Sequence, residues 1–295
     1  MELNSLVSIV IPTHNRREKI IRLIDSIKRC KYPQSKIEII IVDDASTDNT
    51  LEAVQKLFSD IKVLRNNVEL FPSACRNLGI MSSRGNYIFL IDDDNVLDRT
   101  AISELVKIFA RYKDVGLAGP IAYYYKNPEK IWCAGGKLSL PILIPWYISQ
   151  GETVQEFSEK WVIECDYVPN AFMINKEIVS CIGLFDERLP IGWEEADLAL
   201  RIKKRGYRVV VSTAAKIFHD VPMTWDFHIT ERRAYWRGRS RVLFCRKHVP
   251  IRRFLIIIDI LGFMILLLKL NKRMEKYLPQ YIKGIKNGLA YNFNS

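Results

Sequence analysis

The amino-acid sequence predicts an α/β fold in which helices cover both faces of a mostly parallel sheet. Short apolar runs rich in β-branched residues alternate with segments of helical periodicity over residues 1–120. The apolar runs are nearly continuous, as in strands that are buried on both faces. Polar or acidic residues follow several of these runs, at the strand ends where such sheets bind ligands.

The predicted elements follow one another regularly through the first half of the chain. The expected strands cover Leu6–Pro12, Ile37–Val42, Ile61–Leu64 and Tyr87–Ile91. The expected helices between them cover Arg17–Lys28, Leu51–Phe58 and Ala74–Ser82. Regular patterns return later as a strand over Ala171–Ile174, a helix over Glu194–Arg205 and a strand over Arg208–Val211. Residues 121–170 lack clear periodicity and are rich in Tyr, Trp and Pro, which favours loops around a binding cleft.

The positive charge of the chain is concentrated near the C-terminus. The formal net charge is +11, and residues 231–276 alone hold 13 Lys and Arg against 3 Asp and Glu. Because the rest of the chain is nearly neutral, we do not expect binding to nucleic acid. The basic segment encloses the apolar run Phe254–Leu268, which is too short for a comfortable bilayer span and favours a helix in the membrane interface. A buried core helix or a dimer helix is the alternative, and the oligomeric state stays open.

The cysteines and the N-terminus predict an intracellular setting. The six cysteines lie far apart without a Cys-x-x-Cys pair, which indicates neither a zinc site nor a disulfide framework. Isolated cysteines usually pack as small buried residues and suit a reducing compartment. No cleavable export signal precedes the first strand. We therefore expect a cytoplasmic protein that lies peripherally on the inner face of the membrane.

Three acidic sites stand at the ends of predicted elements. Asp44 follows the second strand, where its carboxylate could accept hydrogen bonds from a nucleobase or a ribose, or could cap the next helix. Asp92 and Asp94 point the same way from an extended segment and can converge on one hard divalent ion that bridges to a diphosphate. Glu194 and Glu195 begin a predicted helix, where one of them could act as a general base. An acidic surface turn and helix-dipole stabilisation are the alternatives for the last two sites.

Other patterns bear on rival functions. The chain has no glycine-rich phosphate loop, so a bound diphosphate would need a metal ion and basic side chains such as Arg16 and Arg76. A sugar nucleotidyltransferase would carry a glycine-rich basic loop after the first strand, and a phosphatase with an Asp nucleophile would place its Asp-x-Asp there. A non-catalytic basic membrane-binding module accounts for the C-terminal charge and leaves the acidic strand ends unexplained.

Four segments, taken together, resemble glycosyltransferase family 2, a family of inverting enzymes with the GT-A fold that includes rhamnosyltransferase-like members. These segments are Val7–Arg16, Ile37–Thr50, Ala74–Asn95 and Gly183–Val209, in the family's order. The resemblance implies a GT-A domain over residues 1–230, with a nucleotide-sugar-binding half in 1–120 and an acceptor-side half in 121–230. A basic and apolar helical extension would follow over 231–295.

The resemblance also implies roles for individual residues. The implied nucleotide-sugar contacts are Pro12, His14, Asn15, Arg16, Asp44, Arg76, Asp92 and Asp93. The implied ligands of a Mg²⁺ or Mn²⁺ ion are Asp94, Asp92 and His219. The family's Glu-Asp pair reads Glu194-Glu195 here, which puts Glu195 at the position of the base and leaves Glu194 as the alternative. The family's small-residue loop before this pair reads Val168-Pro169-Asn170-Ala171, without glycine.

The activity implied by the resemblance is hexosyl transfer by metal-assisted single displacement with inversion. The donor would be a nucleotide sugar, and the acceptor a hydroxyl group of a glycan, either lipid-linked or at the cell surface. The sequence leaves the sugar, the nucleobase and the acceptor unidentified.

Overall fold

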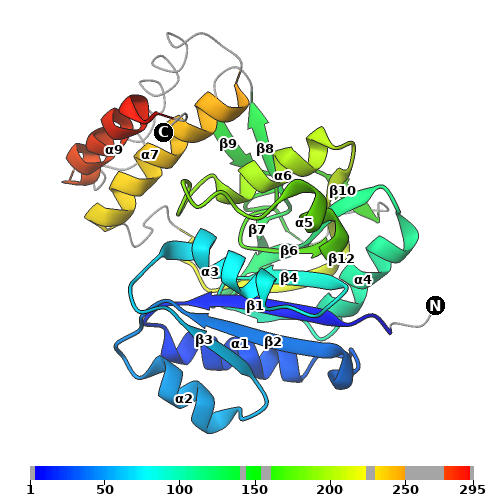
Figure 1. Ribbon diagram of the computed structural model, residues 1–295. Coiled ribbons are helices and arrows are strands. Elements are labelled where there is room, and N and C mark those ends of the chain that lie inside the picture. The colour runs from blue at the N-terminus through cyan, green and yellow to red at the C-terminus, as the bar shows by residue number, and fades with distance from the viewer. Residues whose placement is uncertain (1–3, 140–143, 154–160, 224–229, 250–275, 293–295) are drawn as a thin grey trace.

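The computed structural model contains one mixed sheet with helices on both of its faces (Figure 1). The structure describes residues 4–139, 144–153, 161–223, 230–249 and 276–292. The ten strands of this sheet follow the order β10-β12-β6-β11-β4-β1-β2-β3, with β5 beside β12 and β7 beside β6. The predicted α/β class with a Rossmann-like sheet is confirmed.

The bounds of the elements are as follows. The strands are β1 (Val7–Thr13), β2 (Ile37–Asp43), β3 (Lys62–Arg65), β4 (Tyr87–Ile91), β5 (Asn95–Leu97), β6 (Val115–Tyr124), β7 (Asn127–Cys133), β8 (Gly136–Ser139), β9 (Ile144–Tyr147), β10 (Val162–Glu164), β11 (Ala171–Asn175) and β12 (Arg208–His219). The helices are α1 (Arg17–Lys28), the 3-10 turn η1 (Gln34–Lys36), α2 (Thr50–Leu57), α3 (Phe71–Met81), α4 (Ala101–Arg111), α5 (Lys176–Ile182), α6 (Glu194–Lys204), α7 (Glu231–His248) and α9 (Leu278–Ala290).

Side chains of the central strands enter two separate cores, one on each face of the sheet. In β1, Val10 packs in one core while Ile9 and Ile11 pack in the other, and β2 and β4 repeat this alternation. Helices α3, α5 and α6 contribute to the first core, and α1 and α4 to the second. Since both faces are buried, the strands read as continuous apolar runs in the sequence.

Most predicted elements lie close to their expected positions, and α1 and β4 have the expected bounds. The prediction of loops over residues 121–170 is wrong in part, because the end of β6 and all of β7 to β10 lie there. Strand β6 contains Pro120 and two glycines, which read as turn residues although the whole strand is buried. Gly119 has a packing role, since an added Cβ would lie 2.3 Å from a methyl carbon of Val168.

The cysteines behave largely as predicted. All six are free thiols, and five of them are buried. Cys181, on α5, is the exposed one.

The strand order reverses its direction of growth at β1. Strands β2 and β3 add on one side of β1, and β4 pairs with its other side in parallel. Open α/β sheets bind ligands in the crevice at the carboxyl ends of the strands beside such a reversal. Strand β1 ends at Thr13 and β4 ends just before Asp92. The fold therefore places the aspartate triplet at this crevice.

Helices α7 and α9 lie side by side at one end of the molecule (Figure 1). Glycines permit their close approach, because an added Cβ at Gly238 would lie 2.3 Å from the carbonyl oxygen of Tyr281 and one at Gly284 would clash with that of Tyr235. Among the described residues, no helix is long and apolar enough to cross a bilayer. The run Phe254–Leu268 lies outside the described residues, so the interfacial helix stays a prediction.

Candidate active site

A cavity of about 550 Å³ opens at the carboxyl ends of β1, β2 and β4. The predicted site residues that line it are Pro12, His14, Arg16, Asp44, Arg76, Asp92, Asp93, Asp94, Glu194, Glu195 and His219. Asn15 is not among the lining residues. Its side chain instead accepts a hydrogen bond from the backbone N–H of Thr47 (2.7 Å), which ties the loop after β1 to the loop after β2.

Arg16 and Thr13 hold two carboxylates of the aspartate triplet, those of Asp93 and Asp94. Nη1 of Arg16 lies 2.5 Å from Oδ2 of Asp94 and 3.1 Å from Oδ1 of Asp93. The hydroxyl of Thr13 donates to Oδ2 of Asp93 (2.8 Å). Burial raises the pKa of Asp93. Burial alone would also raise the pKa of Asp94, but His219 and Arg16 outweigh it and hold that pKa well below its usual range.

His219 reaches the triplet because of strand pairing. Strand β12 pairs with β5 so that His219 stands opposite Asn95, the residue after Asp94. Nε2 of His219 lies 3.2 Å from Oδ1 of Asp94. The indole of Trp132 packs edge-on against the imidazole, with ring centroids 4.3 Å apart. The strand predicted from the sequence ended at Val211, whereas β12 continues to His219. The prediction therefore did not show that strand pairing brings His219 to the triplet.

The Asp94–His219 pair fits part of a divalent-metal site. Among the described residues, no group of three or more His, Cys, Asp or Glu side chains could hold a metal ion. However, Oδ1 of Asp94 is buried and makes no hydrogen bond to a described residue, and Nε2 of His219 faces it at 3.2 Å, so both atoms are available to one ion. Mg²⁺ and related ions are commonly held by one or two protein ligands, with water and substrate phosphates completing the shell. Asp92 pairs instead with Arg76, so its role as a third ligand stays a prediction.

Arg76, which lines the cavity, joins the two acidic sites. Its side chain is 2% exposed, and its guanidinium contacts Asp92 (2.7 Å), Glu194 (3.0 Å) and Glu195 (3.2 Å). A buried charge of this kind is tolerated only when it is paired. Burial lowers the pKa of Arg76, but the three carboxylates outweigh it and raise the pKa, so the guanidinium is permanently charged. It therefore fixes Asp92 relative to Glu194 and Glu195.

Glu195 has a defined hydrogen-bond partner and an available oxygen. Its Oε1 accepts from the backbone N–H of Asn170 (2.8 Å) and from Arg76, which leaves Oε2 for the cavity. Burial, together with Glu194 and Asp92, outweighs Arg76 and raises the pKa of Glu195 to about 8. The Glu194 side chain is only 5% exposed, against 17% for Glu195. This geometry favours Glu195 as the carboxylate that meets a substrate.

The loop Val168-Pro169-Asn170-Ala171, which contains no glycine, supplies the backbone hydrogen bond to Glu195. Asn170 adopts φ +72°, a left-handed conformation that asparagine tolerates better than most residues. Its side-chain amide exchanges two 2.8 Å hydrogen bonds with that of Asn95, which follows the triplet. Asparagine thus serves here where a glycine was expected, and it connects the loop to both acidic sites.

Asp44 holds the loop that leads into α3. Its carboxylate accepts hydrogen bonds from the backbone N–H groups of Leu70 and Phe71 (both 2.8 Å) and from the Asn66 amide (2.8 Å). The alternative that Asp44 caps the next helix is wrong, because Asp48 accepts from the N–H of Thr50 at the start of α2. Asp44 lines the cavity, and its contact with a nucleobase or ribose stays a prediction.

Several lining residues were not predicted from the sequence. Aromatic side chains of Trp132, Tyr147, Tyr167 and Trp193 contribute to the wall, and the first three come from the stretch expected to surround a cleft. Two arginines of α7 also line the cavity, Arg233 and Arg237. Many basic residues occur near them in the sequence, and only the orientation of α7 distinguishes the two that face inward.

Comparison with known proteins agrees with this architecture. The chain is 24% identical over 274 residues to the probable glycosyltransferase YdaM of Bacillus subtilis, with 87% of this chain and 61% of that protein covered. The fold is similar to that of GalNAc-T7 in complex with UDP, GalNAc and Mn²⁺ (TM-score 0.65, 17% identity, 82% of this chain and 50% of that one). It is also similar to the mannosyltransferase PcManGT from Pyrobaculum calidifontis in complex with GDP-Man and Mn²⁺ (TM-score 0.60, 17% identity, 98% and 76%).

These likenesses confirm the GT-A fold, although the chain spans only about three fifths of the length of YdaM. The family model described as Glycosyl transferase family 2 matches residues 8–183, which is more than half of the chain. The order of the matched motifs and the fold agree with this match. The chain therefore belongs to glycosyl transferase family 2.

Proposed function

We propose that this protein transfers a hexosyl group from a nucleotide sugar to a hydroxyl group of a glycan, with inversion at the anomeric carbon. The observation that carries the proposal is that Glu195 and the Asp94–His219 pair face one cavity, where Arg76 joins Glu195 to Asp92 of the same aspartate triplet. A base and a site for a leaving diphosphate are the two elements that a single displacement needs.

In the proposed displacement, residues of the chain accept a proton, orient the base and bind the leaving group. Oε2 of Glu195 takes the proton of the acceptor hydroxyl while the hydroxyl oxygen bonds to the anomeric carbon. The bond from that carbon to the diphosphate oxygen breaks, and the nucleoside diphosphate leaves with the electron pair. Asn170 and Arg76 orient Glu195 through its Oε1. A Mg²⁺ or Mn²⁺ ion bound by Asp94 and His219, with Asp92 as a further candidate, would neutralise charge on the leaving group.

The donor half of the proposal rests on the residues around the crevice. Pro12, His14, Asp44, Arg16 and Arg76 line the cavity, and we assign them to the donor. The similar structures of PcManGT and GalNAc-T7 were obtained with GDP-Man and UDP, respectively, together with Mn²⁺. These complexes support a nucleotide-sugar donor and a divalent ion for this chain.

The proposed acceptor is a glycan at the cytoplasmic face of the membrane, lipid-linked or destined for the cell surface. The basic balance of residues 231–276 supports contact with an anionic surface. Sedimentation with liposomes containing anionic lipid tests this part separately. Binding that weakens with salt is expected, and a protein that stays in the supernatant at low salt contradicts the membrane proposal.

A screen of nucleotide sugars tests the function itself. The protein is incubated with uridine, guanosine, cytidine and thymidine diphosphate sugars, with Mn²⁺ or with EDTA, and released nucleoside diphosphate is measured. Release from one donor in Mn²⁺ but not in EDTA supports transfer. Release of pyrophosphate from a sugar phosphate and a nucleoside triphosphate would support a nucleotidyltransferase instead.

A further inference from the structure

Most cations around the cavity are already committed to carboxylates. Arg16 pairs with Asp93 and Asp94, and Arg76 pairs with three carboxylates. Arg233 differs from them. Within the part of the chain that the structure describes, no carboxylate forms an ion pair with its guanidinium, although the residue lines the cavity.

Arg233 and Arg237 stand one turn apart on α7 and both line the cavity. Residues four apart share a face of a helix, and the two positions are separated by about 6 Å along its axis. Among the carboxylates, Arg233 interacts electrostatically with Glu69, Asp93 and Asp94, whereas Arg237 interacts with Glu194. Arg233 is therefore within electrostatic reach of the proposed metal site, and Arg237 within reach of Glu194, which adjoins the proposed base.

The two guanidiniums repel each other in a confined space. Burial lowers the pKa of Arg237, and the charge of Arg233 lowers it further. Burial likewise lowers the pKa of Arg233, and Arg16 adds to the effect. An anion bound between the guanidiniums of Arg233 and Arg237 would offset the repulsion between them. The flat guanidinium fork matches the oxygens of a phosphate.

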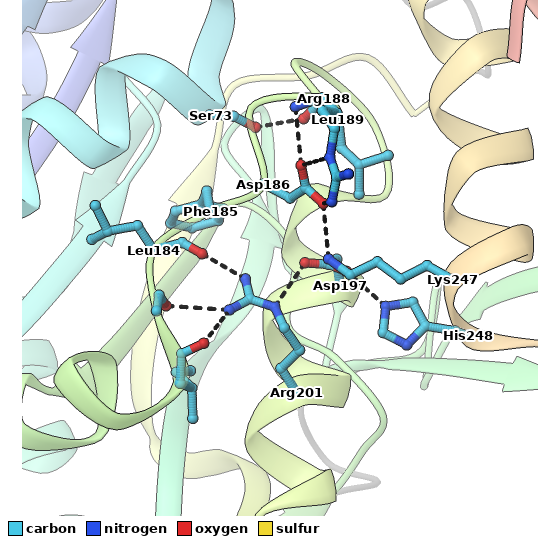
Figure 2. A network of polar contacts seen from close by, with 12 residues as sticks. Ser73, Leu184, Phe185, Asp186, Arg188, Leu189, Asp197, Arg201, Lys247 and His248 are labelled. Carbon is cyan, nitrogen blue, oxygen red and sulfur yellow. Dashed lines mark hydrogen bonds and ion pairs between the residues drawn. The ribbon is translucent and has the colours of Figure 1, made fainter. Parts of the chain in front are cut away.

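The C-terminal end of helix α7, the helix that carries this arginine pair, is anchored by ion pairs. Figure 2 shows Lys247 and His248, at the end of α7, bonded to the buried carboxylate of Asp197 at 2.7 Å and 2.6 Å. Asp197 follows Glu195 by two positions on α6. The same end of α7 is tied to Asp186 by Lys247 (2.9 Å). Thus one network sets the position of the helix with the arginine pair relative to the helix with the proposed base.

We infer that Arg233 and Arg237 together bind a phosphate group inside the cavity, facing the proposed metal site. This inference rests on the proposed function, in which such a group belongs either to the diphosphate of the donor or to a phosphate of the acceptor. The shared chemistry is a phosphate with at least two free oxygens, one for each guanidinium.

Calorimetric titration of the full chain with inorganic pyrophosphate in metal-free buffer tests the pair directly. The wild-type protein is expected to bind, with affinity that falls as salt rises. Arg233→Gln and Arg237→Gln are each expected to weaken binding by about tenfold or more, and the Lys variants by less because the charge remains. Arg205→Gln is the matched control, because Arg205 is exposed at the far end of α6 and should leave the affinity unchanged.

Competition identifies the source of the phosphate. Displacement of pyrophosphate by UDP or GDP in proportion to their own binding indicates the donor diphosphate. Arginine-dependent binding of pyrophosphate to nucleotide-saturated protein indicates a phosphate of the acceptor.

The failures of the two proposals are distinguishable. Arginine-dependent pyrophosphate binding without turnover of any nucleotide sugar would keep the phosphate site and reject the proposed transfer. If the wild-type protein turns over a nucleotide sugar and the Arg233→Gln/Arg237→Gln protein binds pyrophosphate as tightly as the wild type, the proposed transfer stands and the phosphate site is rejected. A wild-type protein that does not bind pyrophosphate also overturns the pair. Circular dichroism and thermal unfolding of each variant confirm that the fold is retained.

Discussion

Nη2 of Arg76 lies 3.2 Å from Oε1 of Glu195, although the two residues stand 119 positions apart in the chain. The same guanidinium contacts Asp92 and Glu194. Two acidic segments that are far apart in the chain are therefore bound to a single buried cation. This contact predicts that the stability of the protein and the geometry of its site depend on the same residue.

Replacement of Arg76 by methionine is expected to lower the free energy of unfolding by about 3–5 kcal/mol, because it leaves buried carboxylates without their cation. Urea denaturation measures this change. Arg208→Met serves as a control, since Arg208 pairs with the exposed residues Asp114 and Glu164 and should cost less than about 1 kcal/mol. Equal stabilities for the Arg76 and Arg208 variants would contradict the proposed role of Arg76.

Loss of the Asp94 carboxylate or of the His219 imidazole is expected to weaken metal binding. We expect Asp94→Ala and His219→Ala to reduce the Mn²⁺ affinity of the nucleotide-bound protein by at least about tenfold, with Asp94→Ala also abolishing transfer. Mn²⁺ binding is followed by calorimetry with UDP or GDP present. Asp114→Asn is the control, because Asp114 is exposed, pairs with Arg208 and does not line the cavity. Full Mn²⁺ affinity in the Asp94→Ala protein would exclude this residue as a ligand.

The raised pKa of Glu195 sets the direction of the pH dependence. A general base works only when it is deprotonated, and burial shifts that transition to a pKa of about 8. The value of kcat/KM should therefore rise with pH and level off above about 8, rather than level off near the ordinary glutamate pKa of about 4.3. Initial rates between pH 6 and 10 check this, at saturating metal. A value of kcat/KM that does not change above pH 6 would contradict the raised pKa of Glu195.

The network around Asp197 predicts a coupling between stability and activity. Asp197 is fully buried and accepts from Arg201 on its own helix and from Lys247 and His248 on α7 (Figure 2). Asp197→Asn keeps the shape of the side chain but removes its charge, so we expect a loss of about 3 kcal/mol of unfolding free energy. The rate of transfer should fall as well, because α6 carries Glu195. Wild-type kcat in a destabilised Asp197→Asn protein would show that the network stabilises the fold without positioning the base.

The part of the site that follows strands was predictable from the sequence. A fully apolar strand that ends in acidic residues can place them only at the edge of the sheet, so the positions of Asp44 and Asp92–Asp94 followed from local pattern. The helix that begins at Glu194 was predicted in the same way. These are short-range properties, and the resemblance of the motifs implied that the residues serve one site.

What escaped prediction depends on contacts between distant segments. The glycines of β6 look like turn residues until Val168 is seen packed against Gly119. Asn170 gives no sequence signal for its left-handed conformation or for its hydrogen bond to Glu195. Arg233 and Arg237 resemble the many other basic residues near them, because only the docking of α7 on α9 and α6 decides which side chains enter the cavity.

One comparison decides whether Glu195 is the base opposite the Asp94–His219 pair. Turnover and donor affinity are measured together for the wild-type protein and for Glu195→Gln, with the donor found in the nucleotide-sugar screen. We expect Glu195→Gln to bind the donor as the wild-type protein does while kcat falls by about 10²–10⁴-fold. Wild-type turnover by Glu195→Gln would contradict the assignment.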